Sequence, residues 1–176
     1  MNLLEQVTDL LTDSEIPACL IGAAAMAAHG VPRSTLDLDL LTTDVRTLDE
    51  SLWAPLEQAG AEVEVRRGDH GDPLAGVVRI AADSERTVDL IVGRYSWQSR
   101  IIDRARPVAI QGARITVAEP ADLVLLKLYA AGPQDRWDIQ QILGAQETEG
   151  VLASVEERLE DLPPECSALW RSLLAT

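Results

Sequence analysis

Apolar and polar positions follow two different periods along this chain. A strand period of two and short apolar runs dominate as far as residue 118, and a helical period follows. Strands are predicted at 18–21, 36–42, 62–66, 77–82, 87–92, 108–110 and 114–117, the last two joined by a turn at Gln111-Gly112. Helices are predicted at 3–11, 22–30, 45–59, 95–104, 120–131, 134–145, 151–162 and 163–174.

This order of elements predicts an α/β (α+β) fold. Residues 1–118 would form a core with a mixed sheet flanked by helices. Residues 119–176 would form a C-terminal helical region packed on that core. The boundary falls near Ala118, where strand patterning stops.

Composition narrows the class of protein. The chain has 176 residues, of which 47% are apolar and 25% charged, as in globular domains. No apolar run is long enough to span a membrane, and the first residues lack the order of a signal peptide. Cys19 and Cys166 lie far apart and form no metal-type pair. We therefore expect no membrane partner and a cytoplasmic location.

The net charge of the chain favours some classes of ligand over others. The formal net charge of −14 argues against a broad nucleic-acid surface, although a few local cations could still hold a nucleotide. An acidic surface also suits a basic protein partner. Lys127 is the only lysine among 15 basic residues, which makes it a candidate for a position where a compact charge is needed; chance retention of one lysine is the alternative.

Asp37 and Asp39 flank Leu38 in a predicted strand, so their carboxylates point to the same face. Neighbouring carboxylates repel each other unless a cation lies between them, and Mg²⁺ prefers such oxygen ligands. A simple polar outer face would give the same pattern. Asp89 stands in a later apolar strand and is the candidate third carboxylate; an edge-strand acid or a helix cap is the alternative.

Gly22 and Ala23 lie where a predicted strand turns into a helix. A glycine at such a junction allows a phosphate to approach unpaired backbone amides. Tight packing alone could also require it. The junction precedes Asp37 by about fifteen residues, which would place an anion site beside the metal site.

The ordered set Gly22-Ala23, Asp37-x-Asp39 and Asp89 resembles the nucleotidyltransferase superfamily of polymerase β type. The run 29–39, HGVPRSTLDLD, looks like its small bacterial members. Residues 120–128, PADLVLLKL, followed by 135–139, DRWDI, are similar to the AbiEii-like toxins of type IV toxin–antitoxin systems. Ala23 departs from the family, which usually has glycine or serine there.

The resemblance implies an NTP substrate and two Mg²⁺ ions held by Asp37, Asp39 and Asp89. It implies that Lys127 contacts the triphosphate or the acidic centre, although a lysine in an apolar helix can also snorkel to solvent. Arg33 is a further candidate for the nucleotide phosphates, or a solvated arginine. Asp138 would orient Lys127 or a substrate hydroxyl.

These calls lead to an Mg²⁺-dependent transfer of NMP to a hydroxyl acceptor, which could be tRNA, a protein or a small molecule. A toxin role would add an antitoxin protein as partner. Two alternatives stay open: a non-catalytic member that binds a nucleotide or protein, favoured by Ala23, and an antibiotic nucleotidyltransferase, favoured by the acidic charge. We expect His29 and Trp97 to serve packing or capping and His70 to be exposed.

Overall fold

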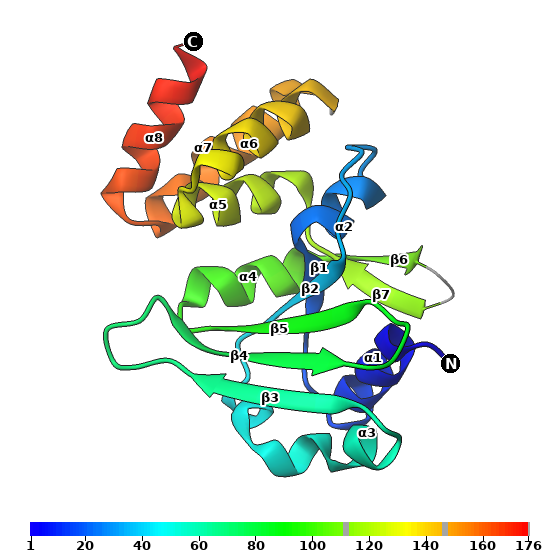
Figure 1. The fold of residues 1–176 in the computed structure, drawn as a ribbon. Coiled ribbons are helices and arrows are strands. Elements are labelled where there is room, and N and C mark those ends of the chain that lie inside the picture. The colour runs from blue at the N-terminus through cyan, green and yellow to red at the C-terminus, as the bar shows by residue number, and fades with distance from the viewer. Residues whose placement is uncertain (111–112, 146–147, 176) are drawn as a thin grey trace.

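The computed structural model describes residues 1–110, 113–145 and 148–175. Its centre is a seven-stranded mixed sheet in the order β3-β4-β5-β2-β1-β7-β6 (Figure 1). The strands are β1 (Cys19–Ile21), β2 (Asp37–Thr42), β3 (Glu62–Arg67), β4 (Leu74–Ala81), β5 (Thr87–Gly93), β6 (Arg106–Ile110) and β7 (Ala113–Val117). The predicted hairpin of β6 and β7 is confirmed, and its turn at 111–112 lies outside the described residues.

Helices flank the sheet as the sequence predicts, which confirms the mixed fold class. The α-helices are α1 (Leu3–Asp13), α2 (Gly22–Ala28), α3 (Ala54–Gln58), α4 (Ser96–Arg104), α5 (Pro120–Ala130), α6 (Pro133–Ala145), α7 (Thr148–Arg158) and α8 (Pro164–Leu174). The last four follow β7 directly, and the division of the chain at 118 stays a prediction. No helix among the described residues combines the length and apolarity that crossing a bilayer requires.

The two faces of the central strands have different compositions. β2 and β5 run parallel, with Asp39 opposite Asp89 and Leu40 opposite Leu90. Because side chains alternate along a strand, the leucines point to one face and the acids to the other. The apolar face is completely buried: Leu40, Val78, Ile80, Val88, Leu90 and Val92 are each 0% exposed.

The acidic face is only partly covered. Figure 1 shows α4, α5 and the helices after α5 on one side of the sheet, and α1 and α3 on the other. Leu41, further along β2, is buried, whereas Asp37 and Asp39 keep partial access to solvent. The half-covered face is therefore the place where β2 and β5 can meet a ligand.

The helix predicted over 45–59 is wrong for most of its length. Two short 3₁₀ turns, η1 (Val45–Leu48) and η2 (Glu50–Trp53), precede α3. Asp44 accepts a hydrogen bond from the Arg46 amide at 2.9 Å, and Asp49 accepts one from the Ser51 amide at 3.0 Å. Each aspartate thus caps a new turn, because its short side chain competes with continued helix formation.

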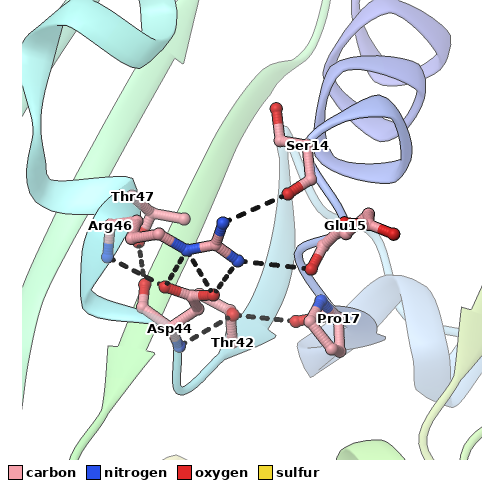
Figure 2. A network of polar contacts seen from close by, with 7 residues as sticks. All are labelled: Ser14, Glu15, Pro17, Thr42, Asp44, Arg46 and Thr47. Carbon is pink, nitrogen blue, oxygen red and sulfur yellow. Dashed lines mark hydrogen bonds and ion pairs between the residues drawn. The ribbon is translucent and has the colours of Figure 1, made fainter.

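The Arg46 guanidinium also fixes this segment to the end of α1. It donates to both oxygens of Asp44 and to the carbonyls of Ser14 and Glu15 (Figure 2). Nearby, the Thr42 hydroxyl donates to the Pro17 carbonyl at 2.8 Å. These long-range contacts hold β2 at its C-terminal end, and the periodicity of 45–59 gives no sign of them.

Candidate active site

The structure brings the three predicted carboxylates together on the half-covered face. Asp37 and Asp39 alternate with Leu38 in β2, and Asp89 is the register partner of Asp39 in β5. Residues in register on adjacent strands carry their side chains on the same face, a few ångströms apart. Asp39 and Asp89 thus lie side by side with Asp37 on the same face, and their role as joint metal ligands stays a prediction.

Gly22 lies against the Asp39 carboxylate. It starts α2 in a left-handed conformation, with φ +65°, directly after the last residue of β1. A Cβ on Gly22 would lie 3.0 Å from Asp39 Cγ and closer still to Asp39 Oδ2. Only glycine allows this backbone and this approach, so Gly22 is required by Asp39 itself. Ala23 follows as the second residue of the helix.

Burial and nearby negative charge distinguish Asp39 from the other two acids. Burial, together with the negative charges of Asp89 and Asp37, raises the pKa of Asp39 to about 6, although Lys127 and Arg79 oppose this shift. A carboxylate in this state is stabilised by added positive charge. Paired oxygen ligands of this kind suit Mg²⁺, so the chemistry of Asp37 and Asp39 fits a hard divalent cation.

Asp89 is already engaged by an arginine. Arg79 of β4 donates from Nε to Asp89 Oδ1 at 2.8 Å and from Nη2 to Asp89 Oδ2 at 2.7 Å. This bidentate pair engages both carboxylate oxygens, so a metal at Asp89 would compete with the Arg79 guanidinium. Within the described part of the chain, no group of three or more histidine, cysteine or acidic side chains is arranged to hold a metal ion.

Lys127 contributes positive charge from the helix above the acids. Its Nζ lies 2.6 Å from Asp138 Oδ2 and 3.0 Å from Asp135 Oδ1, and its side chain is 15% exposed. Lys127 also lines the same pocket as Asp39. The sequence predicted that this lysine snorkels or finds an anion, and it pairs with two aspartates of α6.

Asp138 holds Lys127 and lies outside the pocket lining. Its side chain is 3% exposed, and its Oδ1 atom forms an ion pair with Arg33 Nη1 at 3.5 Å. This buried oxygen accepts no hydrogen bond among the described residues. The Arg33 guanidinium stacks 5.8 Å from the ring centre of Trp137. Arg33 thus contacts α6, and it lines neighbouring hollows rather than the pocket of Asp39.

Sequence reasoning missed Arg79 and Trp137. Trp137 is 45% exposed, whereas Trp97 is 5% exposed and packs edge-on against Tyr129. The helical period of α6 offered a signal, because a buried Asp138 turns its neighbour toward solvent. The packing role of Trp97 is confirmed, and His29 donates from Nε2 to the Ala118 carbonyl at 2.8 Å.

A cavity of about 570 Å³ adjoins Asp39, and neither Asp37 nor Asp89 is among its lining residues. It lies between the acidic face of the sheet and helix α5, with Pro73 and Leu74 at its edge. This volume is typical of sites for small molecules and cofactors. Its wall combines polar groups from Asp39, Lys127 and Asp135 with apolar side chains from Leu41, Leu123 and Leu126.

The family of the chain follows from a match over residues 1–159 to the model described as "Nucleotidyltransferase of unknown function (DUF6036)". The chain belongs to this nucleotidyltransferase family. No curated protein sequence matches it significantly.

Solved structures show the same fold at low sequence identity. The antibiotic-resistance factor ANT(2'')-Ia in complex with adenylyl-2''-tobramycin has a TM-score of 0.56 and 14% identity, covering 90% of this chain and 95% of that one. The lincomycin-bound lincosamide adenylyltransferase LnuA has a TM-score of 0.53 and 15% identity, covering 81% and 96%.

A third similar structure is an antigenic nucleotidyltransferase-like protein from Paracoccidioides brasiliensis. Its TM-score is 0.51 at 17% identity, with coverage of 95% of this chain and 90% of that one. These likenesses show that the DUF6036 chain shares its fold with these nucleotidyltransferase structures.

Proposed function

We propose that this protein is an Mg²⁺-dependent nucleotidyltransferase that transfers NMP from an NTP to a hydroxyl acceptor. The observation that carries the proposal is the Asp39 carboxylate, which is pressed against Gly22 between two further acids and has its pKa raised to about 6. Such crowding costs stability, and a divalent cation with its bound triphosphate would relieve it. Membership of the nucleotidyltransferase family supports this interpretation.

Asp37 and Asp39 would hold the cations, with Asp89 as the third ligand once Arg79 moves away. Bound Mg²⁺ would neutralise charge on the phosphates and on the leaving pyrophosphate. Lys127, which shares the pocket with Asp39, would contact the triphosphate, while Asp138 fixes the direction of its ammonium. The backbone amides of Gly22 and Ala23, together with Arg33, would bind the same triphosphate more weakly.

The transfer itself is an in-line displacement. The acceptor oxygen attacks the α-phosphorus, the bond from that phosphorus to the bridging oxygen of the β-phosphate breaks, and pyrophosphate leaves. The hydroxyl proton passes to a nearby carboxylate, for which Asp89 is the candidate base. The products are the nucleotidylated acceptor and pyrophosphate, so charge and atoms balance.

A cationic small molecule is the acceptor class that the charge distribution favours. The chain carries a net charge of −14, and the pocket beside the acids is largely apolar. Both features suit an amphipathic cation better than tRNA. Two similar structures hold an adenylylated antibiotic and lincomycin. An antibiotic acceptor is therefore our second, more specific candidate.

The likeness of 120–128 and 135–139 to AbiEii-like toxins supports a third candidate, a cytoplasmic toxin with an antitoxin partner. A protein acceptor or tRNA would favour it. The non-catalytic alternative draws support from Ala23 and from the Arg79–Asp89 pair, which occupies the third carboxylate. Calorimetry with ATP and Mg²⁺ separates this alternative, because binding without pyrophosphate release would support it.

The test is transfer of label from α-³²P-labelled NTPs to tRNA, proteins and cationic antibiotics. We expect a Mg²⁺-dependent product with the wild-type chain and none with Asp37→Ala or Asp39→Asn. Asp83→Asn is the matched control, because Asp83 is an exposed acid of the turn after β4. Equal transfer by wild type and the Asp39→Asn variant would overturn the proposal.

A further inference from the structure

Arg79 places a positive charge directly beside Asp89. The residue belongs to β4 and is the register partner of Asp89, as Asp89 is of Asp39. Three strands therefore present Arg79, Asp89 and Asp39 in one row across the sheet. The guanidinium makes two parallel hydrogen bonds to Asp89, at 2.8 and 2.7 Å, which only arginine can do with a carboxylate.

The ion pair between Arg79 and Asp89 can separate because its arginine side faces solvent. The Arg79 side chain is 51% exposed, whereas that of Asp89 is 13% exposed, so the guanidinium covers the acid from the solvent side. Exposed ion pairs contribute little net free energy because water and salt compete with them. Arg79 can thus leave Asp89 without disturbing the buried face of the sheet.

Arg79 has no comparable hold on the other two acids. Both hydrogen bonds of its guanidinium to these acids go to Asp89, and its charge only partly offsets the burial and the neighbouring carboxylates that raise the pKa of Asp39. The three carboxylates therefore differ in availability. Asp37 and Asp39 are open to a cation, and Asp89 is closed by an internal one.

We propose that Arg79 is an internal counter-ion that excludes Asp89 from divalent-ion binding until the guanidinium is displaced. This inference rests on the proposed function, because it assumes that Asp37 and Asp39 bind a divalent ion. It assigns Arg79 a positioning role: the free protein binds a metal through the β2 acids alone, and Asp89 joins only when Arg79 moves to another anion. The phosphates of the nucleotide are an anion of suitable charge and geometry.

The test measures Mn²⁺ binding to the full-length protein without nucleotide, by the loss of the free Mn²⁺ signal in electron paramagnetic resonance. We expect Arg79→Gln to bind Mn²⁺ about tenfold more tightly than wild type, because Asp89 is released and a nearby positive charge is removed. Arg79→Lys should fall between the two, since lysine keeps the charge and loses the fork.

Arg66→Gln is the matched control for the change in charge. Arg66 lies on β3, binds Glu64 at 2.8 and 3.1 Å, and is close enough for Asp89 to affect its pKa. It makes no hydrogen bond to the metal-site acids in the described structure. We expect less than a twofold change in Mn²⁺ affinity for Arg66→Gln.

A double-mutant cycle with Asp89→Asn decides whether the effect runs through Asp89. We expect Arg79→Gln to tighten Mn²⁺ binding about tenfold in the wild-type background and less than about threefold in the Asp89→Asn background, where only the loss of the nearby positive charge remains. A gain of the same size in Asp89→Asn, or a gain in the wild-type background equal to that of Arg66→Gln, would overturn the inference while leaving the metal site intact.

Failure of the proposed function gives a different result. If Asp39→Asn binds Mn²⁺ as wild type does, or if no variant binds it, the β2 acids are not a metal site and the inference falls with them. Circular dichroism of each variant establishes that it is folded. If Arg79→Gln does not fold, Arg79→Lys takes its place in the comparison of Mn²⁺ affinity with wild type.

Discussion

Two acidic clusters in this protein, Asp122 with its arginine partners and the group of Asp37, Asp39 and Asp89, have their negative charge neutralised to very different degrees. Asp122, in the first turn of α5, is 0% exposed and binds Arg104 through two hydrogen bonds of 3.0 and 2.6 Å. Arg158 of α7 adds a third contact at 3.0 Å. Asp39 lies between Asp37 and Asp89 and has a raised pKa. The first cluster joins helices, and the second keeps unrelieved charge.

The difference separates structure from function. A buried acid with two arginines is satisfied by the chain itself, so it holds α4, α5 and α7 together. Acids that repel one another cost stability, and proteins retain such groups mainly where a ligand uses them. We therefore expect opposite effects when a carboxylate is removed from each cluster.

Removal of the satisfied acid should have the largest effect. We expect Asp122→Ala to lower the free energy of unfolding by about 3–5 kcal/mol, because two arginines lose their buried partner. Denaturant titration at pH 7 measures it. Asp161→Ala is the control: its pair with Arg100 is exposed and should contribute less than about 1 kcal/mol. Equal losses in the two variants would remove the distinction between the clusters.

Gly22→Ala should have the next largest effect. The new Cβ would collide with the Asp39 carboxylate and would occupy a left-handed backbone, for a total cost of about 3 kcal/mol. Gly30→Ala is the matched control, because Gly30 has φ +80° and a Cβ there meets nothing within 4 Å. We expect a loss of about 1 kcal/mol for the control, measured by the same titration. Similar losses would show that the collision with Asp39 is unimportant.

Asp39→Asn should stabilise the protein at alkaline pH. The folded-state pKa of about 6 exceeds the unfolded value, so the folded chain holds the proton more tightly and stability falls as the pH rises from about 4 to 6. Above pH 6 Asp39 is ionised in the folded state, and its full destabilising effect is present. We expect a gain of about 2 kcal/mol at pH 8 in EDTA and none at pH 4, measured by thermal unfolding. A destabilised variant at pH 8 would contradict the assigned cost of burying this charge beside two other carboxylates.

Much of the candidate site could be predicted because its signals are local. The spacing of Asp37 and Asp39 within one strand fixes their common face, and Gly22 marks a strand-to-helix junction. The single lysine, Lys127, stood out by composition. Each of these inferences requires only the geometry of one element.

The contacts that could not be predicted depend on register between elements. Arg79 and Asp89 meet because β4 and β5 pair antiparallel with these residues opposite each other. Asp122 meets Arg104 and Arg158 only after three helices have packed. The contacts of Arg46 are of the same kind, since it binds the carbonyls of Ser14 and Glu15 at the distant end of α1.

The most direct test of the central claim is thermal unfolding with and without Mn²⁺ at pH 8, for wild type and Asp39→Asn. A cation that binds only the folded state raises its melting temperature. We predict a saturable rise for wild type, which disappears below pH 6 as Asp39 takes up its proton, and no rise for Asp39→Asn. The same rise in both proteins, or none in wild type, would contradict the assignment of these acids to a divalent cation.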